Sequence, residues 1–373
     1  MSTRRVLILG STGSIGRNTL DVIDHLNALH AAGRSPDRFE VVGLAAGSRA
    51  DVLGDQAKRF PDAAAVLAAD APEGPRRMAE SLDCDLVVAA IVGVAGLGPT
   101  LAAVERGIDV ALANKESLVV AGTLLMAAAA RSGSVIRPVD SEHAAVAECL
   151  LGRDHAEIER VVLTASGGAF RDRDPGSLAD ATVDEALDHP TWDMGAKVTI
   201  DSATLMNKVL ELIEAHHLFG LPGSRLDAVI HRSSMIHALV EFVDGGVVTQ
   251  IAPPDMRMPI QRALAWPHCL PGLSPRLGLD AACELTLEPI CADRYPAYAL
   301  AHPTLAAGGT AGCVLNAANE AAVAGFLAGT YRFGDLVPLV SAAAAAFPAE
   351  PLRDLGHALD LDAEVRGWVA GRA

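Results

Sequence analysis

The chain has few aromatic residues and fewer basic than acidic ones. Phe, Trp and Tyr make up only 4 % of its 373 residues although half of the residues are hydrophobic, so we expect a core built mainly from Ala, Val, Leu and Ile. The 30 basic and 46 acidic residues give a formal net charge of −16. Surfaces that bind nucleic acid or anionic membranes carry a basic footprint. The composition therefore argues against both kinds of partner, whereas a phosphorylated small molecule needs only a few local donors.

Cysteine pairs and long apolar runs are also lacking. The six cysteines form no CxxC pair and no other zinc-like spacing, which favours reduced and mostly buried thiols. No apolar run is long and uninterrupted enough to span a bilayer. An apolar strand at 6–9 begins directly after Met-Ser-Thr-Arg-Arg, which leaves no room for a signal or transit peptide. We therefore expect a cytoplasmic protein.

The length of the chain indicates two or three domains. In its first part, short apolar runs alternate with helical patterns, as expected for a parallel sheet with helices on both faces. The expected strands are 6–9, 39–46, 86–92 and 110–113, and the expected helices include 15–26 and 97–106. We predict an α/β fold that opens with a Rossmann-like domain over residues 1–139.

The rest of the chain is expected to contain a second domain, a linker and a third domain. Strands at 160–164, 226–231 and 247–251, with a helix over 201–219, predict a catalytic α/β domain over 140–265. Residues 266–293 contain four prolines and three cysteines with little periodicity, which is typical of a linker. From 294 to 373 the chain is rich in Ala, the best helix former, and helices are expected over 314–328 and 339–346. We predict an α-helical bundle there.

Three glycines between the first strand and the first helix suggest a dinucleotide site. Gly10, Gly13 and Gly16 have the spacing GxxGxxG, and a tight turn there lets backbone N–H groups approach a pyrophosphate. A plain glycine-rich turn is the alternative. The second strand is followed by Gly47-Ser48-Arg49, with no carboxylate for a ribose hydroxyl and an arginine placed to meet a 2′-phosphate. This favours NADP, unless Arg49 is simply a solvated loop residue.

An acidic pair follows the apolar strand 135–139. In an extended segment Asp140 and Glu142 would face the same side, and two converging carboxylates need a cation or a proton between them. Glu211 could complete the set. Oxygen ligands without cysteine or paired histidine indicate Mg²⁺ or Mn²⁺. His143 leaves a mixed nitrogen and oxygen site open, although a lone histidine more often packs or donates a hydrogen bond.

The segment 201–211 combines a helix start with polar residues at helical spacing. Asp201 or Ser202 can cap a helix that ends near Gly220. Asn207 and Glu211, at i and i+4, share one face of it. A solvent-facing polar surface is the alternative for a single helix.

A phosphate pocket and a lid are expected nearby. Ser166-Gly167-Gly168 follows a strand, where small residues allow an anion to approach closely, and an ordinary turn is the alternative. Together with Ser202, Asn207 and Lys208 this segment offers hydroxyl, amide and ammonium donors. The intervening stretch 189–195 contains Pro, Gly and Trp192 in a polar context, which suggests a mobile lid that excludes water. The alternative is a surface loop with Trp192 in the core.

These strings together resemble the 1-deoxy-D-xylulose 5-phosphate reductoisomerase family, in the expected order and over nearly the whole chain. The strings are LGSTGSIG at 9–16, AAIVG at 89–93, LANKESLV at 112–119, PVDSEH at 138–143, SGGAFR at 166–171, HPTWDMG at 189–195, DSATLMNKVLE at 201–211, PPDMR at 253–257 and LNAANE at 315–320. No single string is decisive, but their joint occurrence is very specific.

The resemblance implies roles for individual residues. A divalent metal would be held by Asp140, Glu142 and Glu211. The phosphorylated sugar would be bound by Ser141, Ser166, His189, Trp192, Ser202, Asn207 and Lys208. NADPH would be bound by Gly10, Ser11, Thr12, Gly13, Ser14, Ile15, Gly47, Ser48, Arg49, Asn114, Glu116 and Gly195. The catalytic residues would be Glu142, Lys115, which would reach the substrate, and His189.

The resemblance also implies an activity and an assembly. The expected reaction is the NADPH- and Mg²⁺- or Mn²⁺-dependent conversion of 1-deoxy-D-xylulose 5-phosphate to 2-C-methyl-D-erythritol 4-phosphate, in isoprenoid precursor biosynthesis by the non-mevalonate route. Residues 186–196 would form the lid, and the protein would be a homodimer. Some residues depart from the family pattern without removing a ligand and would alter the fine shape of the pocket: Val209, Arg232-Ser233, Ala252-Pro253, Ala169 and Arg49.

Other functions stay open on the residues alone. An NADP-linked semialdehyde dehydrogenase would need a nucleophilic cysteine paired with a histidine, and the cysteines here stand in apolar or linker contexts. A catalytically degenerate NADP-binding regulator would be expected to lose the metal carboxylates. Another NADP-dependent reductase of a phosphorylated sugar is a further alternative, as is a related branch that runs the same reaction with an altered lid and pocket.

Overall fold

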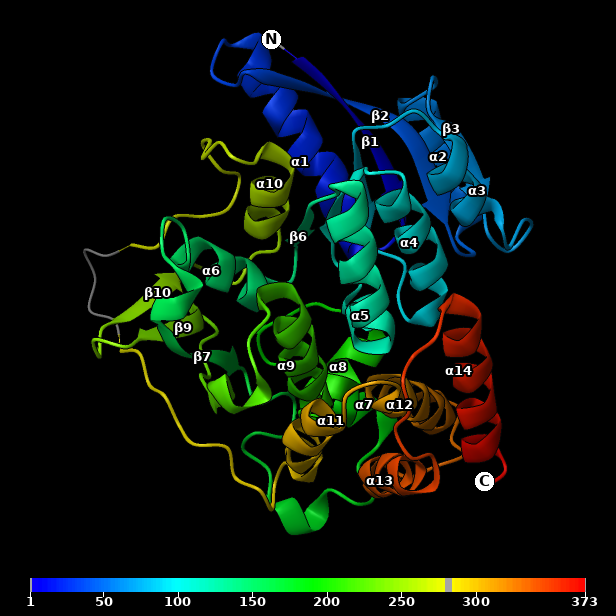
Figure 1. Ribbon diagram of the computed structural model, residues 1–373, viewed down its shortest axis with the longest axis vertical. Helices are drawn as coiled ribbons and strands as arrows, with labels where there is room; N and C mark the ends of the chain where they lie inside the picture. Colours follow the sequence, from blue (N-terminus) through cyan, green and yellow to red (C-terminus); the bar gives the residue numbers. More distant parts are fainter. Residues whose placement is uncertain (1, 279–283, 373) are drawn as a thin grey trace. The chain divides into compact units, whose positions relative to one another are not determined.

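The computed structural model describes residues 2–278 and 284–372. The chain divides into two compact units. Figure 1 shows its helices and strands, coloured along the sequence. Unit 1 contains the chain up to residue 117 together with 125–144 and 255–276, and unit 2 contains 118–124, 145–254 and the chain from 277 onward. The division into domains and a linker drawn from the sequence stays a prediction.

Unit 1 is built on a parallel six-stranded sheet. Its strands are β1 (Ser2–Leu9), β2 (Asp37–Ala46), β3 (Ala64–Leu67), β4 (Leu86–Ala89), β5 (Asp109–Leu112) and β6 (Ile136–Pro138). Their order in the sheet is β3-β2-β1-β4-β5-β6, which is the order of the doubly wound dinucleotide-binding fold. The predicted Rossmann-like architecture is confirmed. All residues of β4 and the last four of β1 are buried, as apolar strands covered on both faces should be.

The helices of unit 1 connect these strands, and one returns from much later in the chain. They are α1 (Ser14–Ala31), α2 (Ala50–Arg59), α3 (Gly74–Ser81), α4 (Leu97–Glu105), α5 (Lys115–Ser132, non-helical at Ala121) and α10 (Arg257–Ala265). Ile260 and Leu264 of α10 are buried in the same core cluster as Leu26 of α1 and Val41 of β2. Apolar burial therefore attaches residues 255–276 to unit 1.

Unit 2 combines a mixed sheet with helices. The sheet order is β10 (Val247–Ile251), β9 (Ile236–Phe242), β7 (Ile158–Ala165) and β8 (Leu226–Ile230); only the β7–β8 pair is parallel. Its helices are α7 (Val183–Leu187), α8 (Ala196–Thr204), α9 (Met206–Phe219), α11 (Ala301–Ala307), α12 (Ala311–Leu327), α13 (Leu336–Ala346) and α14 (Leu355–Ala370). In Figure 1, α12, α13 and α14 lie together in orange to red, which confirms the helical C-terminal part.

Two local expectations are wrong. The single helix expected over 201–219 is two helices, because Leu205 between α8 and α9 has φ 65°. Asp201 and Ser202 consequently lie inside α8 and cap nothing. The extended segment expected through Glu142 is also absent: β6 ends at Pro138, which has no N–H to donate to a ladder, and α6 (Ser141–Cys149) starts three residues later.

Several smaller features bear on the sequence expectations. The expected strand 86–92 ends at Ala89. No helix of the described residues is long and apolar enough to cross a membrane. Among the described cysteines, Cys84, Cys149 and Cys313 are buried, Cys269 and Cys291 are exposed, and all are free. Cys283 and the part 279–283 of the expected linker lie outside the described residues.

Candidate active site

The glycine-rich turn after β1 lies at the carboxyl edge of the parallel sheet. Gly10 has φ 90°, and a Cβ there would lie 2.3 Å from the carbonyl oxygen of Ala90. The backbone N–H groups of Gly10 and Ser11 both donate to the carbonyl of Ala45 at 2.8 Å. At Gly16 a Cβ would lie 2.4 Å from the carbonyl oxygen of Gly10. Close backbone packing therefore requires glycine at the first and third positions of the motif.

The first turn of α1 is the part of this segment that can donate backbone hydrogen bonds to a ligand. Gly13 is the N-cap residue, and no side chain caps the helix. The first N–H groups of a helix have no acceptor within the helix, so those of Ser14 and Ile15 face outward along its axis. Thr12 is buried beside them. Gly10 and Ser11, by contrast, use their N–H groups to hold the turn itself.

The other predicted cofactor residues of unit 1 follow neighbouring strands at the same edge of the sheet. Gly47, Ser48 and Arg49 are exposed between β2 and α2, which leaves the Arg49 guanidinium accessible to a ligand. Asn114 caps α5: its Oδ1 accepts the N–H of Ser117 at 2.9 Å, and its Nδ2 donates to the Oε2 of Glu116 at 3.2 Å. Both Asn114 and Glu116 are buried.

The remaining predicted cofactor residue belongs to the other unit. Gly195 is the exposed N-cap residue of α8 in unit 2.

The three carboxylates predicted to hold a metal come together. One oxygen each of Asp140, Glu142 and Glu211 lies within 4.8 Å of the other two. Asp140 and Glu142 stand at the start of α6, a helix that continues into unit 2, and Glu211 stands on α9. The strand geometry expected for Asp140 and Glu142 is wrong, and the assignment of these three carboxylates to a metal stays a prediction. A donor set made only of carboxylate oxygens fits Mg²⁺ or Mn²⁺ and does not favour zinc.

Two buried lysines accompany these carboxylates. Lys115, the first residue of α5, forms an ion pair with Asp140. Lys208 forms an ion pair with Glu211, and Asn207 also donates to the Glu211 carboxylate. Glu142 accepts a hydrogen bond from the Ser141 hydroxyl at 2.6 Å. The predicted substrate-binding residues Ser141, Asn207 and Lys208 are therefore immediate neighbours of the predicted metal ligands.

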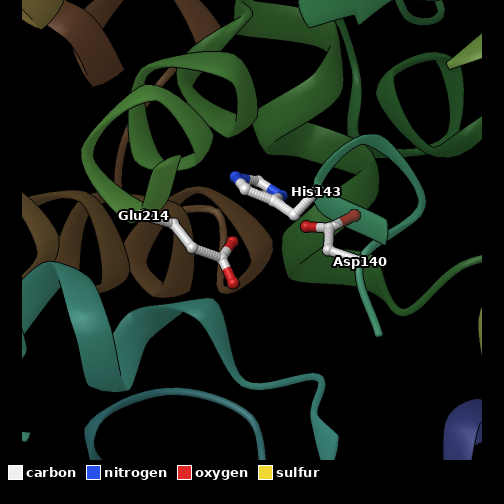
Figure 2. A group of neighbouring side chains, drawn as sticks. All are labelled: Asp140, His143 and Glu214. Carbon is white, nitrogen blue, oxygen red and sulfur yellow. The ribbon is translucent and has the colours of Figure 1, made fainter. Parts of the chain in front are cut away.

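A second group of ligand atoms shares Asp140 with the first. Figure 2 shows the side chains of Asp140, His143 and Glu214 converging, and their ligand atoms lie within 4.8 Å of one another. His143 and Glu214 are fully buried. Sequence reasoning left a mixed site at His143 open but missed Glu214. The available signal was a carboxylate in an apolar run three residues after Glu211, hence on the same helix face.

The Ser166 segment and the predicted lid meet through a histidine. The Nε2 of His189 lies 2.9 Å from the Ser166 hydroxyl oxygen. Its Nδ1 accepts the N–H groups of Thr191 at 3.1 Å and Trp192 at 2.9 Å. Because Nδ1 accepts twice, the ring proton resides on Nε2, which donates toward Ser166. Burial, followed by the nearby charge of Arg171, lowers the pKa of His189 to about 4, so the ring is neutral at pH 7.

The Gly167-Gly168 turn lies against α8. A Cβ on Gly168 would lie 2.4 Å from the carbonyl oxygen of Ser202. The Ser202 hydroxyl donates to the Val198 carbonyl at 2.9 Å and is partly exposed. Unit 2 therefore brings the donors Ser166, His189 and Ser202 to one place, next to the α8–α9 junction from which Asn207 and Lys208 follow.

Asp201 has a structural partner that sequence reasoning missed. Its carboxylate accepts the Asn319 amide of α12 at 2.8 Å and forms an ion pair with Lys197 at 2.9 Å. The LNAANE string at 315–320 held the signal, since an asparagine inside an apolar helix needs a polar partner. Asp201 thus fastens α8 to α12.

The Trp192 ring and the residues that depart from the family pattern also have defined surroundings. Trp192 is half-buried, and its ring lies edge-on to that of buried His237, with the ring centroids 6.4 Å apart. Val209 is fully buried in the core of unit 2. Arg232 pairs with Asp172 and, at 2.6 Å, with Glu288.

Comparison with known proteins agrees along the whole chain. Family models match at 6–73 and 69–122 (1-deoxy-D-xylulose 5-phosphate reductoisomerase), at 136–219 (the C-terminal domain of the same enzyme) and at 251–368 (DXP reductoisomerase C-terminal domain). The 1-deoxy-D-xylulose 5-phosphate reductoisomerase of Leifsonia xyli is 48 % identical over 373 residues, covering 100 % of this chain and 98 % of the relative.

Solved structures agree as well. A crystal structure of DOX-P reductoisomerase in complex with NADPH, fosmidomycin and magnesium matches with a TM-score of 0.91 and 36 % identity, over 99 % of this chain and 98 % of that one. The Zymomonas mobilis 1-deoxy-D-xylulose 5-phosphate reductoisomerase in complex with NADPH matches with a TM-score of 0.87 and 36 % identity, with the same coverage. The chain belongs to the 1-deoxy-D-xylulose 5-phosphate reductoisomerase family.

Proposed function

We propose that the protein is an NADPH- and divalent-metal-dependent reductoisomerase that converts 1-deoxy-D-xylulose 5-phosphate to 2-C-methyl-D-erythritol 4-phosphate. The observation that supports this most is the cluster of Asp140, Glu142 and Glu211 in a member of this family. Relatives of the same family are found in complex with NADPH, magnesium and fosmidomycin. A regulator with a degenerate second site would have no need to keep three converging carboxylates.

The reaction rearranges the carbon skeleton and then reduces it. The C3–C4 bond of the sugar breaks, a C2–C4 bond forms, and the resulting aldehyde receives a hydride and a proton to become an alcohol. When bound, Mg²⁺ or Mn²⁺ supplies Lewis acidity toward the substrate oxygens, and NADPH supplies the hydride. The protein has to hold the sugar, exclude water and move one proton at a hydroxyl in the rearrangement.

Glu142 and Lys115 are the groups we assign to proton transfer. Glu142 belongs to the carboxylate cluster, so it would lie beside substrate oxygens and could accept a hydroxyl proton. Its Oε2 accepts from Ser141 at 2.6 Å, which orients the carboxylate. Lys115 is buried beside Asp140, and its ammonium would stabilise negative charge that develops on a substrate oxygen.

The phosphate of the sugar would be bound by neutral donors and one ammonium. Ser166, Ser202 and Asn207 offer hydroxyl and amide donors, Lys208 offers the positive charge, and neutral His189 offers its Nε2–H. Binding energy gained at this non-reacting phosphate can be used to orient the reacting carbons and to close the segment 186–196, with Trp192 over the substrate.

NADPH would be bound by the turns at the carboxyl edge of the sheet in unit 1. The first N–H groups of α1 would receive the pyrophosphate, and exposed Arg49 would meet the 2′-phosphate. Asn114 and Glu116 would line the same site. Gly195 is assigned to the cofactor from the resemblance.

Location and assembly are further parts of the proposal. We infer a cytoplasmic homodimer that binds neither nucleic acid nor membranes, in keeping with the net charge of −16. Light scattering coupled to size-exclusion chromatography measures the assembly, and a monomer mass at micromolar concentration would contradict it.

Oxidation of NADPH by the purified protein tests the function. The assay contains 1-deoxy-D-xylulose 5-phosphate with Mg²⁺, with Mn²⁺ or with a chelator, and the product is identified by mass spectrometry and NMR. We expect metal-dependent turnover to 2-C-methyl-D-erythritol 4-phosphate. Tight NADPH binding without turnover in either metal would favour the regulator instead.

A further inference from the structure

We propose that Tyr295 is a positioning residue for the phosphate-binding segment Ser166-Gly167-Gly168. This inference rests on the proposed function, because it concerns how the substrate pocket is held in shape. Tyr295 lies 127 to 129 positions further along the chain, just after the segment that the sequence predicts to be a linker. All the residues involved belong to unit 2.

The first observation is a direct hydrogen bond to the turn. The Tyr295 hydroxyl donates to the Gly167 carbonyl oxygen at 2.8 Å. Gly167 is buried with φ 85°, and a Cβ there would lie 3.0 Å from the Tyr295 hydroxyl oxygen. The tyrosine thus both orients the peptide between Gly167 and Gly168 and fills the space beside Gly167. Without the hydroxyl, a buried carbonyl would lose this donor.

The second observation is that Tyr295 is itself firmly anchored. It is 3 % exposed and belongs to a small cluster of buried residues with Ala165, Leu205 and Ile230. Ala165 is the residue before Ser166, and Leu205 is the left-handed junction between α8 and α9. The same small core therefore packs against the residue before Ser166 and against the α8–α9 junction, which are the two backbone segments from which the predicted phosphate donors follow.

Two further contacts hold the residues before Tyr295 in place near the turn. Arg294 donates to the Phe170 carbonyl at 2.8 Å. Glu288 exchanges backbone hydrogen bonds with Ile230 at the end of β8, both at 2.9 Å. Residues on the N-terminal side of Tyr295 are thus held to the end of β8 and to Phe170, and Tyr295 itself contacts the Ser166 turn.

The chemistry of Tyr295 suits a permanent donor. Burial raises the pKa of its hydroxyl to about 12, so it remains protonated throughout the working range of the protein. Its hydrogen bond fixes the Gly167 peptide plane, and Gly168 N–H in turn donates to the Ser166 hydroxyl oxygen at 3.2 Å. The same hydroxyl oxygen receives the Nε2–H of His189 at 2.9 Å. Tyr295 thereby acts on substrate through Ser166.

The chain offers a matched control three residues later. The Tyr298 hydroxyl donates to the Asp227 carboxylate at 2.6 Å and accepts the Ala228 N–H at 3.0 Å. Both of these hydrogen bonds are made to residues of β8, and neither involves the Ser166 turn. Tyr295→Phe and Tyr298→Phe remove the same atom from largely buried rings three residues apart, so Tyr298→Phe controls for the loss of a tyrosine hydroxyl that does not contact the Ser166 turn.

The experiment compares the full-length variants in steady-state kinetics, urea unfolding and hydrogen exchange. We expect Tyr295→Phe to raise KM for 1-deoxy-D-xylulose 5-phosphate about fivefold and leave KM for NADPH unchanged. Tyr298→Phe should leave both constants unchanged. Amides of 166–173 should exchange faster in Tyr295→Phe than in Tyr298→Phe, measured without substrate.

Two results would overturn the inference. One is an unchanged KM for the sugar in Tyr295→Phe alongside a stability loss equal to that of Tyr298→Phe, which would make the role merely structural. The other is unchanged exchange over 166–173. If the wild-type protein did not turn over substrate, that result would count against the proposed function instead. The hydrogen-exchange comparison would still decide whether Tyr295 stabilises the Ser166 turn.

Discussion

Lys208 and Glu211 form an ion pair on the first turns of α9, with both side chains only 1 % exposed. A buried pair of this kind compensates charges that would each be costly alone. A divalent cation bound at Glu211 would take over the compensation of the carboxylate and leave the Lys208 ammonium available to a phosphate. Metal binding and substrate binding would thus be linked through one lysine.

Replacing Lys208 with Met should change how strongly the free energy of unfolding depends on Mg²⁺. Without metal, Glu211 would keep its buried charge next to two other carboxylates, and the free energy of unfolding should fall by about 3 kcal/mol. Mg²⁺ should restore a large part of the loss because it binds only the folded site. Urea unfolding with and without Mg²⁺ measures both effects.

Lys58→Met is the control for that experiment. Lys58 pairs with Asp55 at 2.8 Å on the surface, and loss of an exposed pair should have no measurable consequence with or without Mg²⁺. The link between metal and lysine would be disproved if Lys208→Met were as stable as wild type. It would also be disproved if Mg²⁺ stabilised Lys208→Met and the wild-type protein by the same free energy.

The ionisation of His189 gives a pH prediction. Its pKa is lowered from the usual 6.5 to about 4 by burial and then by Arg171. Between pH 4 and 6.5 the unfolded chain therefore binds more protons at this residue, so stability rises with pH across that window and is lost as the pH falls. NMR titration of the ring signals of the substrate-free protein measures the pKa directly.

His189→Gln assigns the signal and supplies the comparison. The variant should show a weaker dependence of unfolding free energy on pH between 4 and 6.5. A His189 midpoint at or above 6.5 would mean that the folded protein does not disfavour the charged ring, contrary to the neutral ring inferred from its burial and its two accepted backbone N–H groups.

Substitution by alanine should destabilise the protein strongly at Gly10 and hardly at all at Gly47, both in unit 1. Gly10→Ala would place a Cβ 2.3 Å from the Ala90 carbonyl oxygen at φ 90°, so we expect a loss of about 3 kcal/mol in stability and loss of NADPH binding. At Gly47 a Cβ would meet nothing within 4 Å, and Gly47→Ala should change stability by less than about 0.5 kcal/mol.

Thermal unfolding and fluorescence titration with NADPH measure both glycine variants. Normal cofactor affinity in Gly10→Ala would show that the turn after β1 does not shape the cofactor site.

Much of the fold could be predicted because the apolar runs are regular. The runs at 6–9 and 39–46 became β1 and β2, and the Ala-rich stretches became α12 and α13. The strands β3 and β9 and the break between α8 and α9 were missed. β3 is a short strand with no fully buried residue, and the break at Leu205 has no glycine or proline to mark it. Burial of the Leu205 side chain overrides its backbone preference there.

For the site, residue type alone led to the prediction of a hard cation, since three carboxylates have no cysteine partner. The strand geometry on which the convergence of Asp140 and Glu142 was argued is replaced by α6, and metal binding stays a prediction. Contacts between segments far apart in the chain could not be predicted from the sequence. Nothing in the local sequence ties Asn319 to Asp201 or Tyr295 to Gly167, because these pairs are created by packing of segments more than a hundred residues apart.

We propose that Asp140, Glu142 and Glu211 bind the cation on which turnover depends. The most direct measurement is the rate of NADPH oxidation with 1-deoxy-D-xylulose 5-phosphate as a function of Mg²⁺ concentration, for wild type, Glu211→Gln and the control Glu241→Gln, whose carboxylate pairs with Arg160 on the sheet surface. We predict that Glu211→Gln lowers kcat/KM roughly a hundredfold or more and shifts the Mg²⁺ dependence to higher concentration, while Glu241→Gln matches wild type. Wild-type rates and an unchanged Mg²⁺ dependence in Glu211→Gln would contradict the account.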